Sequence, residues 1–179
     1  MTEKAGVHSA AKTFGRAAAG LILAARIVAP APVAWADDVA RGQRIWHDKV
    51  ECNFCHGWAG DGFASGGFHH EGHAPSLRET QLTRDQIRML IQCGRPGTPM
   101  PYFDRFAYTD KRCYGMTEAD LQARNMMPNR ATNTLQQDEI DALADYVATK
   151  IKGAGPVTHA ECVAYFDATT SRCDGYPEK

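Results

Sequence analysis

Apolar residues recur at helical spacing in two segments of the chain. Between Thr83 and Cys93 the apolar face is formed by Ile87, Leu90 and Ile91. Between Gln136 and Ile151 the apolar face is formed by Ile140, Leu143, Tyr146 and Val147. Both segments are predicted to be amphipathic helices, so the chain is predicted to be mostly α-helical.

Glycine and proline interrupt this helical pattern in two places. The stretch from Gly57 to Leu77 is rich in glycine and is predicted to be a loop. The stretch from Gly94 to Phe103 reads Gly-Arg-Pro-Gly-Thr-Pro-Met-Pro-Tyr-Phe, and its prolines prevent a helix. It is predicted to be an extended, rigid loop that presents Met100.

Residues 1–36 follow a different pattern. Basic residues Lys4, Lys12 and Arg16 precede an apolar stretch, which is followed by Ala34-Trp35-Ala36. This order is typical of a secretory signal peptide that is cleaved after Ala36. Arg26 and two prolines interrupt the apolar stretch, whereas a membrane span needs about 20 uninterrupted apolar residues. A retained anchor is the alternative, and the mature chain is predicted to hold no membrane span.

Composition and charge narrow the class of protein. The chain has 179 residues, 44% hydrophobic and 23% charged, which is typical of one soluble globular domain. Loss of residues 1–36 removes four basic residues and one acidic residue, which leaves 16 basic and 20 acidic residues and a net charge of −4. No nucleic-acid partner is predicted for such a chain.

Residues 52–56 read Cys-Asn-Phe-Cys-His, the C-x-x-C-H pattern of covalent haem attachment. Two thiols on one helical turn reach the two vinyl groups of a haem, and the adjacent His56 reaches the iron. A zinc site would need a second ligand pair nearby, and the sequence has none. A redox Cys pair would need a βαβ pattern, whereas the sequence around the motif is helical and rich in glycine. The motif occurs once, so one haem c is predicted, held by Cys52, Cys55 and His56.

The second axial ligand of the iron is predicted to be Met100. Methionine is the usual partner of histidine in electron-transfer cytochromes, and a rigid loop can hold its flexible thioether. Met127, which precedes a proline ahead of the last helix, is the rival, and a histidine or a vacant position is a further alternative. Met89 lies within the predicted helix Thr83–Cys93 and is expected to pack in the core.

Four cysteines remain outside the motif, and an exported chain favours disulfides between them. They allow three pairings. The preferred pairing is Cys93–Cys113 and Cys162–Cys173, because each closes a short local loop. The alternative is that Cys162 or Cys173 attaches the C-terminal tail to the body of the protein.

Three further groups of residues carry weaker signals. The histidines in His-His-Glu-Gly-His (His69, His70 and His73) form either a metal site or a polar loop. The polar residues beside the Met100 loop either contact a haem propionate or lie in solvent: Arg95, Tyr102 and Arg105. Aromatic residues at and after the motif are expected to form walls of the haem pocket: Phe54, Trp58 and Phe63.

From Asp37 to Ile151 the chain resembles class I cytochromes c, which are small helical carriers with one haem. The resemblance implies an opening helix in which Gly42 and Trp46 cross the C-terminal helix. It implies that the carbonyl of Pro75, in Ala74-Pro75-Ser76-Leu77, accepts a hydrogen bond from His56 and so orients its ring. It also implies that Gly97-Thr98-Pro99-Met100-Pro101 is the loop of the methionine ligand.

The chain departs from this family in length. Met100 precedes the last helix by more residues than is usual, so residues 104–135 form an insertion after the loop, and residues 153–179 form an extra tail. The predicted organisation is a signal peptide (1–36), a cytochrome c domain (37–152) and this tail (153–179). The predicted fold is all-α, with three main helices around one haem and with an irregular insertion and tail linked by disulfides.

The insertion and the four additional cysteines are similar to a subgroup of longer periplasmic cytochromes associated with methanol metabolism. The segments that carry this resemblance are Gly94–Phe103 and Phe106–Gly115. It implies single-electron transfer in the periplasm, from a PQQ-dependent methanol or alcohol dehydrogenase towards a terminal oxidase or another cytochrome. The alternatives are a haem subunit of another periplasmic oxidoreductase and a haem-based sensor of small ligands.

Overall fold

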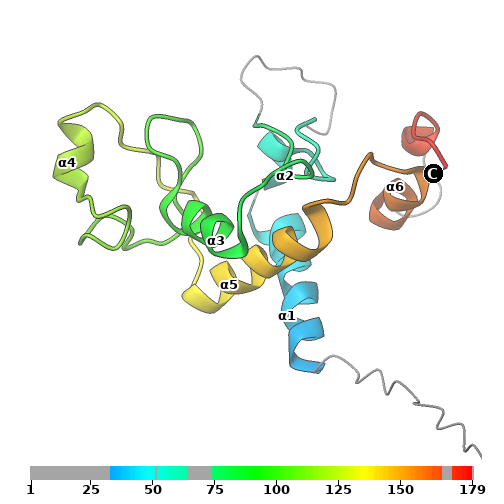
Figure 1. Ribbon diagram of the computed structural model, residues 1–179, viewed down its shortest axis with the longest axis horizontal. Helices are drawn as coiled ribbons and strands as arrows, with labels where there is room; N and C mark the ends of the chain where they lie inside the picture. Colours follow the sequence, from blue (N-terminus) through cyan, green and yellow to red (C-terminus); the bar gives the residue numbers. More distant parts are fainter. Residues whose placement is uncertain (1–32, 51, 64–73, 167–170, 179) are drawn as a thin grey trace, which may run out of the picture. The chain divides into compact units, whose positions relative to one another are not determined.

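A computed structural model describes residues 33–50, 52–63, 74–166 and 171–178 (Figure 1). The chain divides into two units, 1–30 and 31–179, and the description concerns the second. Its helices are α1 (Val33–Arg44), η1 (Ile45–Lys49), α2 (Cys52–His56), α3 (Arg84–Cys93), α4 (Glu118–Gln122), α5 (Gln137–Tyr146), η2 (Val147–Ile151), α6 (His159–Phe166) and η3 (Ser171–Cys173). Within the described ranges there is no β-strand, in agreement with the predicted all-α class.

The two helices predicted from apolar spacing are confirmed. Helix α3 begins after Thr83, whose side chain accepts a hydrogen bond from the backbone of Gln86, while the side chain of Gln86 accepts one from the backbone of Thr83. The predicted helix Gln136–Ile151 is α5 followed by the π-helical turn η2, and its four predicted apolar residues are all buried. Both helices therefore form as the pattern of apolar residues predicts.

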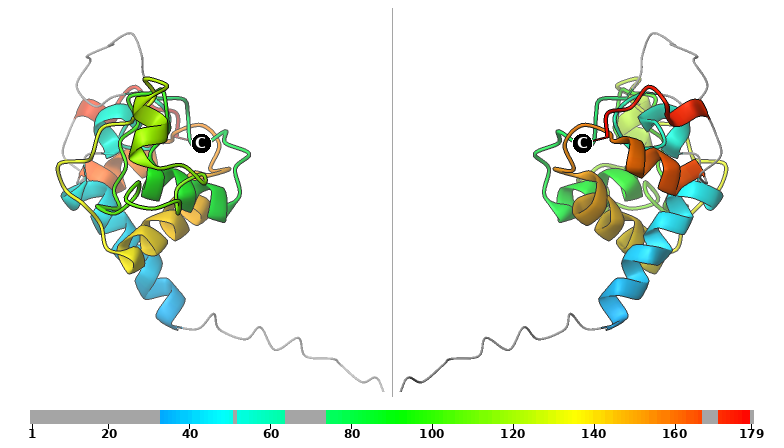
Figure 2. Two further views of the ribbon diagram at one scale, coloured as in Figure 1. Left: turned by 90° about the vertical axis from the view of Figure 1, so that its left-hand side faces the viewer. Right: turned by 90° about the vertical axis from the view of Figure 1, so that its right-hand side faces the viewer.

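Helices α1 and α5 cross at a point where only glycine fits (Figure 2). A Cβ atom placed on Gly42 would lie 2.1 Å from the carbonyl oxygen of Ala142 and 2.7 Å from Cβ of Tyr146. The two backbones therefore approach within van der Waals contact, and Trp46, one turn later, is buried against α5 with its ring 6.2 Å from that of Tyr146. This crossing was implied by the resemblance to class I cytochromes c, and it is confirmed.

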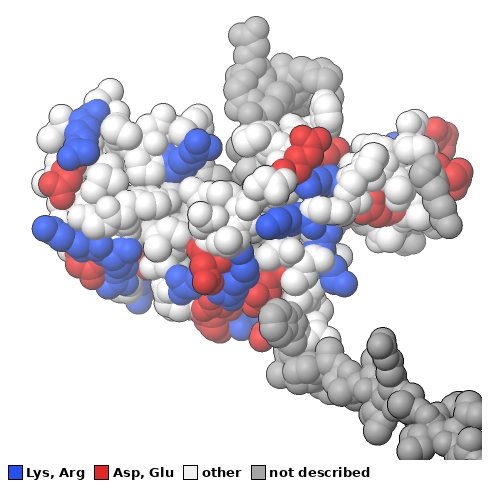
Figure 3. Space-filling view, in the orientation of Figure 1, with Lys and Arg blue, Asp and Glu red and all other residues white. Residues whose placement is uncertain are grey.

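Helix α3 packs against α5 and completes a three-helix core. Ion pairs border this contact: Arg84 binds Asp145 at 2.8 Å and Arg88 binds Asp141 at 2.7 Å. Figure 3 shows acidic and basic side chains side by side over the part of the surface where α3 and α5 lie. Because the pairs are partly exposed, each contributes little to stability, and the apolar core provides most of the stabilisation.

The insertion (104–135) is more regular than predicted. It contains α4, which begins at Thr117 with a reciprocal capping box to Asp120. Leu121 of α4 is fully buried beside the disulfide Cys93–Cys113, in a small apolar cluster that also holds Met89 and Met127. The expected packing role of Met89 is thus confirmed, and the insertion has an apolar cluster of its own next to the end of α3.

The tail (153–179) was predicted to be irregular, and this prediction was wrong. It contains α6 and η3, joined by the disulfide Cys162–Cys173. The backbone N–H of Thr158 donates to Glu161, and Thr158 accepts from the backbone of Glu161, so the helix begins with a capping box that the sequence Thr-x-x-Glu encodes. Together with the disulfide Cys93–Cys113 of the insertion, Cys162–Cys173 confirms the pairing preferred in the sequence analysis.

The predicted signal peptide lies almost wholly outside the described residues, which begin at position 33; the predicted cleavage point after Ala36 falls within α1. None of the helices in the described part of the chain combines the length and the apolar character needed to cross a bilayer.

We expect Gly42→Ala to lower the free energy of unfolding by about 1–3 kcal/mol, the usual range for overpacking a tight contact. The sign is diagnostic, because Gly→Ala inside a helix otherwise stabilises by about 1 kcal/mol. Gly175→Ala in an exposed turn is the control for a glycine change that makes no new contact, since a Cβ there meets no atom within 4 Å. Chemical denaturation followed by circular dichroism measures both, and an unchanged or more stable Gly42→Ala protein would contradict the close crossing.

Candidate functional site

The Cys-x-x-Cys-His motif forms the short helix α2, which begins three positions after the end of η1. The two thiols are not joined to each other or to any other cysteine. Cys52 is partly buried, and loss of solvation raises the pKa of its thiol to about 12, while Cys55 is exposed. The helix ends at Gly57, whose φ of +76° is favourable only for glycine. The motif therefore presents two free thiols from a single helical turn.

A cavity of about 640 Å³ lies beside this helix. It is lined by the motif, by residues of η1, α3, α5 and η2, and by the loop that carries Met100: Trp46, Cys52, Cys55, His56, Ala74–Leu77, Ile87, Leu90, Ile91, Arg95, Thr98–Pro101, Phe103, Leu143 and Val147 among others. Its walls are mainly apolar, and its volume lies within the ~300–1,000 Å³ usual for pockets that bind small molecules and cofactors. The cavity fits a flat apolar cofactor attached through the two thiols.

His56 is buried, with only 9% of its surface exposed. Burial lowers the pKa of the imidazole, and the backbone carbonyl of Pro75 opposes this by raising it. Nδ1 of His56 is buried and has no hydrogen bond of good geometry among the described residues, although the carbonyl of Pro75 lies close enough to raise the pKa of the ring. The lowered pKa keeps the ring neutral near pH 7, and neutral imidazole is the form that binds a metal.

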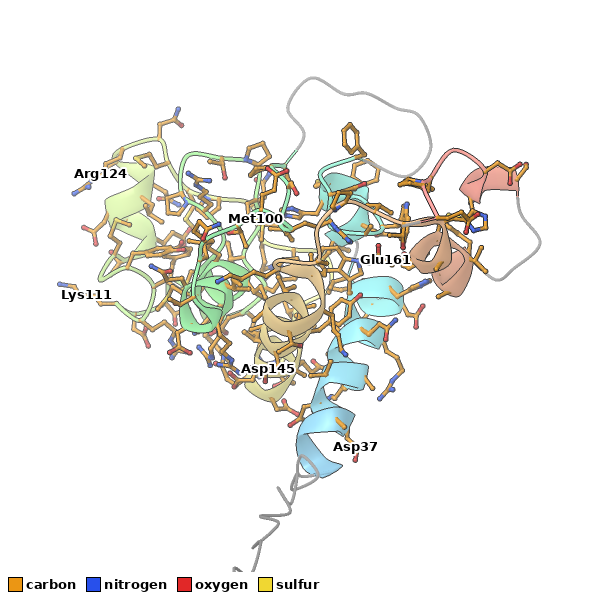
Figure 4. All side chains as sticks on the ribbon, turned by 45° about the vertical axis from the view of Figure 1, so that its right-hand side comes forward. Asp37, Met100, Lys111, Arg124, Asp145 and Glu161 are labelled. Atoms are coloured by element: carbon orange, nitrogen blue, oxygen red, sulfur yellow. A yellow bond between two sulfur atoms is a disulfide. The ribbon has the colours of Figure 1, made fainter. Side chains whose placement is uncertain are left out.

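The structure separates the two candidate methionine ligands. Met100 lines the cavity together with His56, and Figure 4 labels it in the loop that follows α3. Met127 does not line the cavity and packs instead in the apolar cluster of the insertion, near Tyr108 and Leu121. Of the two, only Met100 shares a cavity with the motif.

The aromatic residues predicted to form pocket walls lie elsewhere, and this prediction was wrong. Phe54 and Phe63 are 69% and 66% exposed, and neither lines the cavity. Trp58 is buried against the tail, with its ring 5.0 Å from Tyr165 and its Nε1 donating to the hydroxyl of Tyr176 at 3.3 Å. An aromatic residue just after the motif cannot be assigned to one side from sequence, because the loop turns sharply at Gly57.

The three polar residues beside the Met100 loop have different surroundings. Arg95 lines the cavity, as the propionate interpretation requires. Arg105 stacks on the ring of Phe106 at 4.5 Å, and Tyr102 packs edge-on against Tyr108. Neither of these two lines the cavity. Arg95 is thus the one of the three that is placed to meet a polar edge of the cofactor.

Arg78 is a buried residue that the sequence analysis missed. Its guanidinium donates to the carbonyl of Ala59, next to Trp58, and to Glu161 of α6 at 3.0 Å. It also donates to three backbone carbonyls between α5 and α6: Ala154, Gly155 and Pro156. The loop that follows His56 is thereby joined to the tail through one side chain. A lone arginine in a polar stretch gives no signal of such burial in a single sequence.

The histidine cluster His69, His70 and His73 lies outside the described residues. In the ranges that are described, no three His, Cys, Asp or Glu side chains gather in a way that could hold a metal ion.

Comparison with known families gives one match. Residues 37–118 match the model of the family described as "Cytochrome C oxidase, cbb3-type, subunit III". The match covers a little under half of the chain, and it spans α1, the motif, α3 and the Met100 loop but ends before α5. Neither the curated proteins nor the solved structures contain a significant match.

This match supports a class I monohaem cytochrome c, and it points to an electron-transfer haemoprotein. The cofactor is covalently bound haem c, and the single motif at Cys52–His56 fits one haem. The residues of the cavity agree with this cofactor, because they combine two free thiols, a neutral buried imidazole and apolar walls.

We expect Arg78→Lys to lower the free energy of unfolding by about 3 kcal/mol, because a lysine leaves several buried carbonyls without a donor. Arg84→Lys is the matched control: its side chain is 34% exposed, against 5% for Arg78. Its ion pairs are near the surface, so we expect a loss below about 1 kcal/mol. Equal losses in denaturant titrations of the two variants would contradict the structural role assigned to Arg78.

Proposed function

We propose that the mature chain is a periplasmic carrier of single electrons that holds one haem c between His56 and Met100. The observation that carries this proposal is the shared cavity: one apolar hollow is lined both by the attachment motif and by Met100, which are separated by more than 40 residues in sequence. A carrier needs both axial positions filled, since an open position would invite ligand binding and catalysis instead.

The proposed roles follow from the surroundings of each residue. Cys52 and Cys55 form the two thioether bonds, and His56 donates its neutral ring nitrogen to the iron. Pro75 orients the ring of His56 through its carbonyl, which already acts on the pKa of that ring. Met100 supplies a soft sulfur ligand from a partly buried position against the helical core. Met127 remains the alternative ligand, and its place in a separate apolar cluster counts against it.

The walls of the cavity control the environment of the cofactor. Bound haem supplies an iron that cycles between the ferric and ferrous states. Ile87 and Ile91 of α3 and Leu143 of α5 exclude water from the cavity, which disfavours the more highly charged state of the site. Arg95 at the cavity wall offers a cation to a haem propionate, which lowers the cost of placing that carboxylate near an apolar pocket.

Export to the periplasm is supported by two features. The pattern of residues 1–36 is that of a signal peptide, and the chain forms two disulfides, which persist in oxidising compartments. Attachment of haem c in bacteria also takes place outside the cytoplasm. The disulfides, the motif and the N-terminal pattern thus favour the same compartment.

The donor we propose is a PQQ-dependent methanol or alcohol dehydrogenase, with a terminal oxidase or another cytochrome as acceptor. This part rests on the resemblance of the Met100 loop and the insertion to periplasmic cytochromes of methanol metabolism. A second candidate is favoured by the family match: a haem subunit of a terminal oxidase, as the description of that family names it. The two candidates differ in whether the protein diffuses or stays bound to a partner complex.

We expect the oxidised protein to show the far-red absorption band of ferric iron bound to methionine sulfur. Met100→Ala should abolish the band, because the sulfur that lines the cavity is lost, and Met127→Ala should retain it. Absorption spectra of the three purified holo-proteins measure this. Loss of the band in Met127→Ala alone would overturn the assignment of Met100. A wild type that lacks the band and binds carbon monoxide or cyanide readily would favour a catalytic or sensor function.

We expect substrate-reduced methanol dehydrogenase to reduce the ferric protein at least tenfold faster than it reduces a class I cytochrome c without the insertion. The physical reason is recognition through the insertion, which borders the Met100 loop. Stopped-flow absorbance at one ionic strength measures both rates, since association of charged proteins depends on salt. Equal rates would contradict the proposal that methanol dehydrogenase is the donor. Co-purification with oxidase subunits would favour the second candidate.

A further inference from the structure

The insertion lies alongside the Met100 loop and is hydrogen-bonded to it on both sides of Met100. Before Met100, the backbone N–H of Gly97 donates to the carbonyl of Met126 at 2.9 Å. After it, Tyr102 donates to Asn129 at 3.0 Å and accepts from Ala131 at 2.9 Å through backbone groups. The loop therefore has neighbours along its outer side that a shorter cytochrome without residues 104–135 would lack.

Two tyrosines of the insertion bind the end of the helix from which this loop departs. The hydroxyl of Tyr108 donates to the carbonyl of Cys93 at 2.5 Å, and the hydroxyl of Tyr114 donates to the carbonyl of Gly94 at 2.8 Å. Carbonyls at the end of a helix have no partner within the helix, so these two hydroxyls satisfy adjacent acceptors. Burial raises the pKa of both phenols, which therefore stay protonated and remain donors.

The backbone at Gly94 and Arg95 is in direct contact with the backbone of Met100. The loop folds back so that the backbone N–H of Arg95 donates to the carbonyl of Met100 at 3.2 Å. A Cβ placed on Gly94 would lie 2.8 Å from that same carbonyl oxygen, so the two backbones are in contact. The disulfide Cys93–Cys113 ties the insertion to the same helix end. A shift of Gly94 would therefore move Met100.

We propose that Tyr108 and Tyr114 are positioning residues for the iron–Met100 bond. Their hydroxyls fix the first residues of the loop, and the loop would hold the Met100 sulfur against the iron of bound haem. Neither tyrosine lines the cavity, so both act through the backbone of Cys93 and Gly94. This inference rests on the proposed function, in which Met100 is the axial ligand.

The proposal concerns an equilibrium between bound and released methionine. When the loop is held in place, the sulfur is released from the iron in only a small fraction of molecules. An external ligand such as imidazole binds only to that fraction, so its apparent affinity is proportional to the population of the released state. Removal of one hydroxyl should raise that population about fivefold, as expected for the loss of one ordinary hydrogen bond.

The experiment is an imidazole titration of the oxidised holo-protein, followed at the far-red band, for wild type, Tyr108→Phe, Tyr114→Phe and Tyr176→Phe. Tyr176→Phe is the matched control, because its hydroxyl accepts from Trp58 in the tail cluster and does not contact the loop. We expect the apparent dissociation constant of imidazole to fall about fivefold in each of the first two variants and to stay unchanged in the control. Thermal unfolding of each variant is recorded in parallel.

The outcomes separate this inference from the proposed function. A wild type without the far-red band overturns the axial role of Met100, and the inference with it. If the wild type shows the band but the variants bind imidazole with the same affinity as the wild type, the inference alone is overturned. Because Tyr114 is 40% exposed and phenylalanine retains its ring, this variant should fold even if Tyr108→Phe does not. A lowered melting temperature without a change in imidazole affinity also counts against positioning.

Discussion

The rest of the structure depends on the close approach of α1 and α5 at Gly42. Because no Cβ separates the backbones there, Trp46 and Tyr146 can both be buried at the crossing, and α3 can pack against the other side of α5. The apolar cavity lies next to this three-helix core and shares Trp46, Ile91 and Leu143 with it. This one backbone contact between α1 and α5 thus fixes how close Trp46, which follows α1, lies to Leu143 of α5 at the cavity wall.

Much of the helical core could be predicted from the sequence, because its signals are local. The apolar spacing in residues 83–93 and 136–151 indicates the buried face of a helix. The C-x-x-C-H spacing indicates haem attachment, which needs two thiols on one helical turn. The helices of the insertion and tail could have been found from Thr117-x-x-Asp120 and Thr158-x-x-Glu161, which are capping boxes. Both helices are too short to show the repeated apolar spacing on which the other two helix predictions rest.

The contacts between distant segments could not be predicted, because a single sequence does not state which residues meet. Trp58 could equally have faced the cavity, and only the fold of the tail places it against Tyr165 and Tyr176. Arg78 is buried only because carbonyls from two separate segments, at Ala59 and at 154–156, and the carboxylate of Glu161 surround it. The rigid loop around Met100 already favours Met100 over Met127 as the ligand, and the separation of the two residues into the cavity and the insertion cluster required the structure.

The contact between Arg78 and the tail has a consequence for the order in which the chain matures. A polypeptide is synthesised from its N-terminus, so Trp58 and Arg78 emerge well before α6. Until the last residues arrive, the indole ring stays in water and the guanidinium lacks the carbonyls of Ala154 and Pro156. The side of Trp58 that packs against Tyr165 and Tyr176 is therefore open to solvent until the tail folds against it.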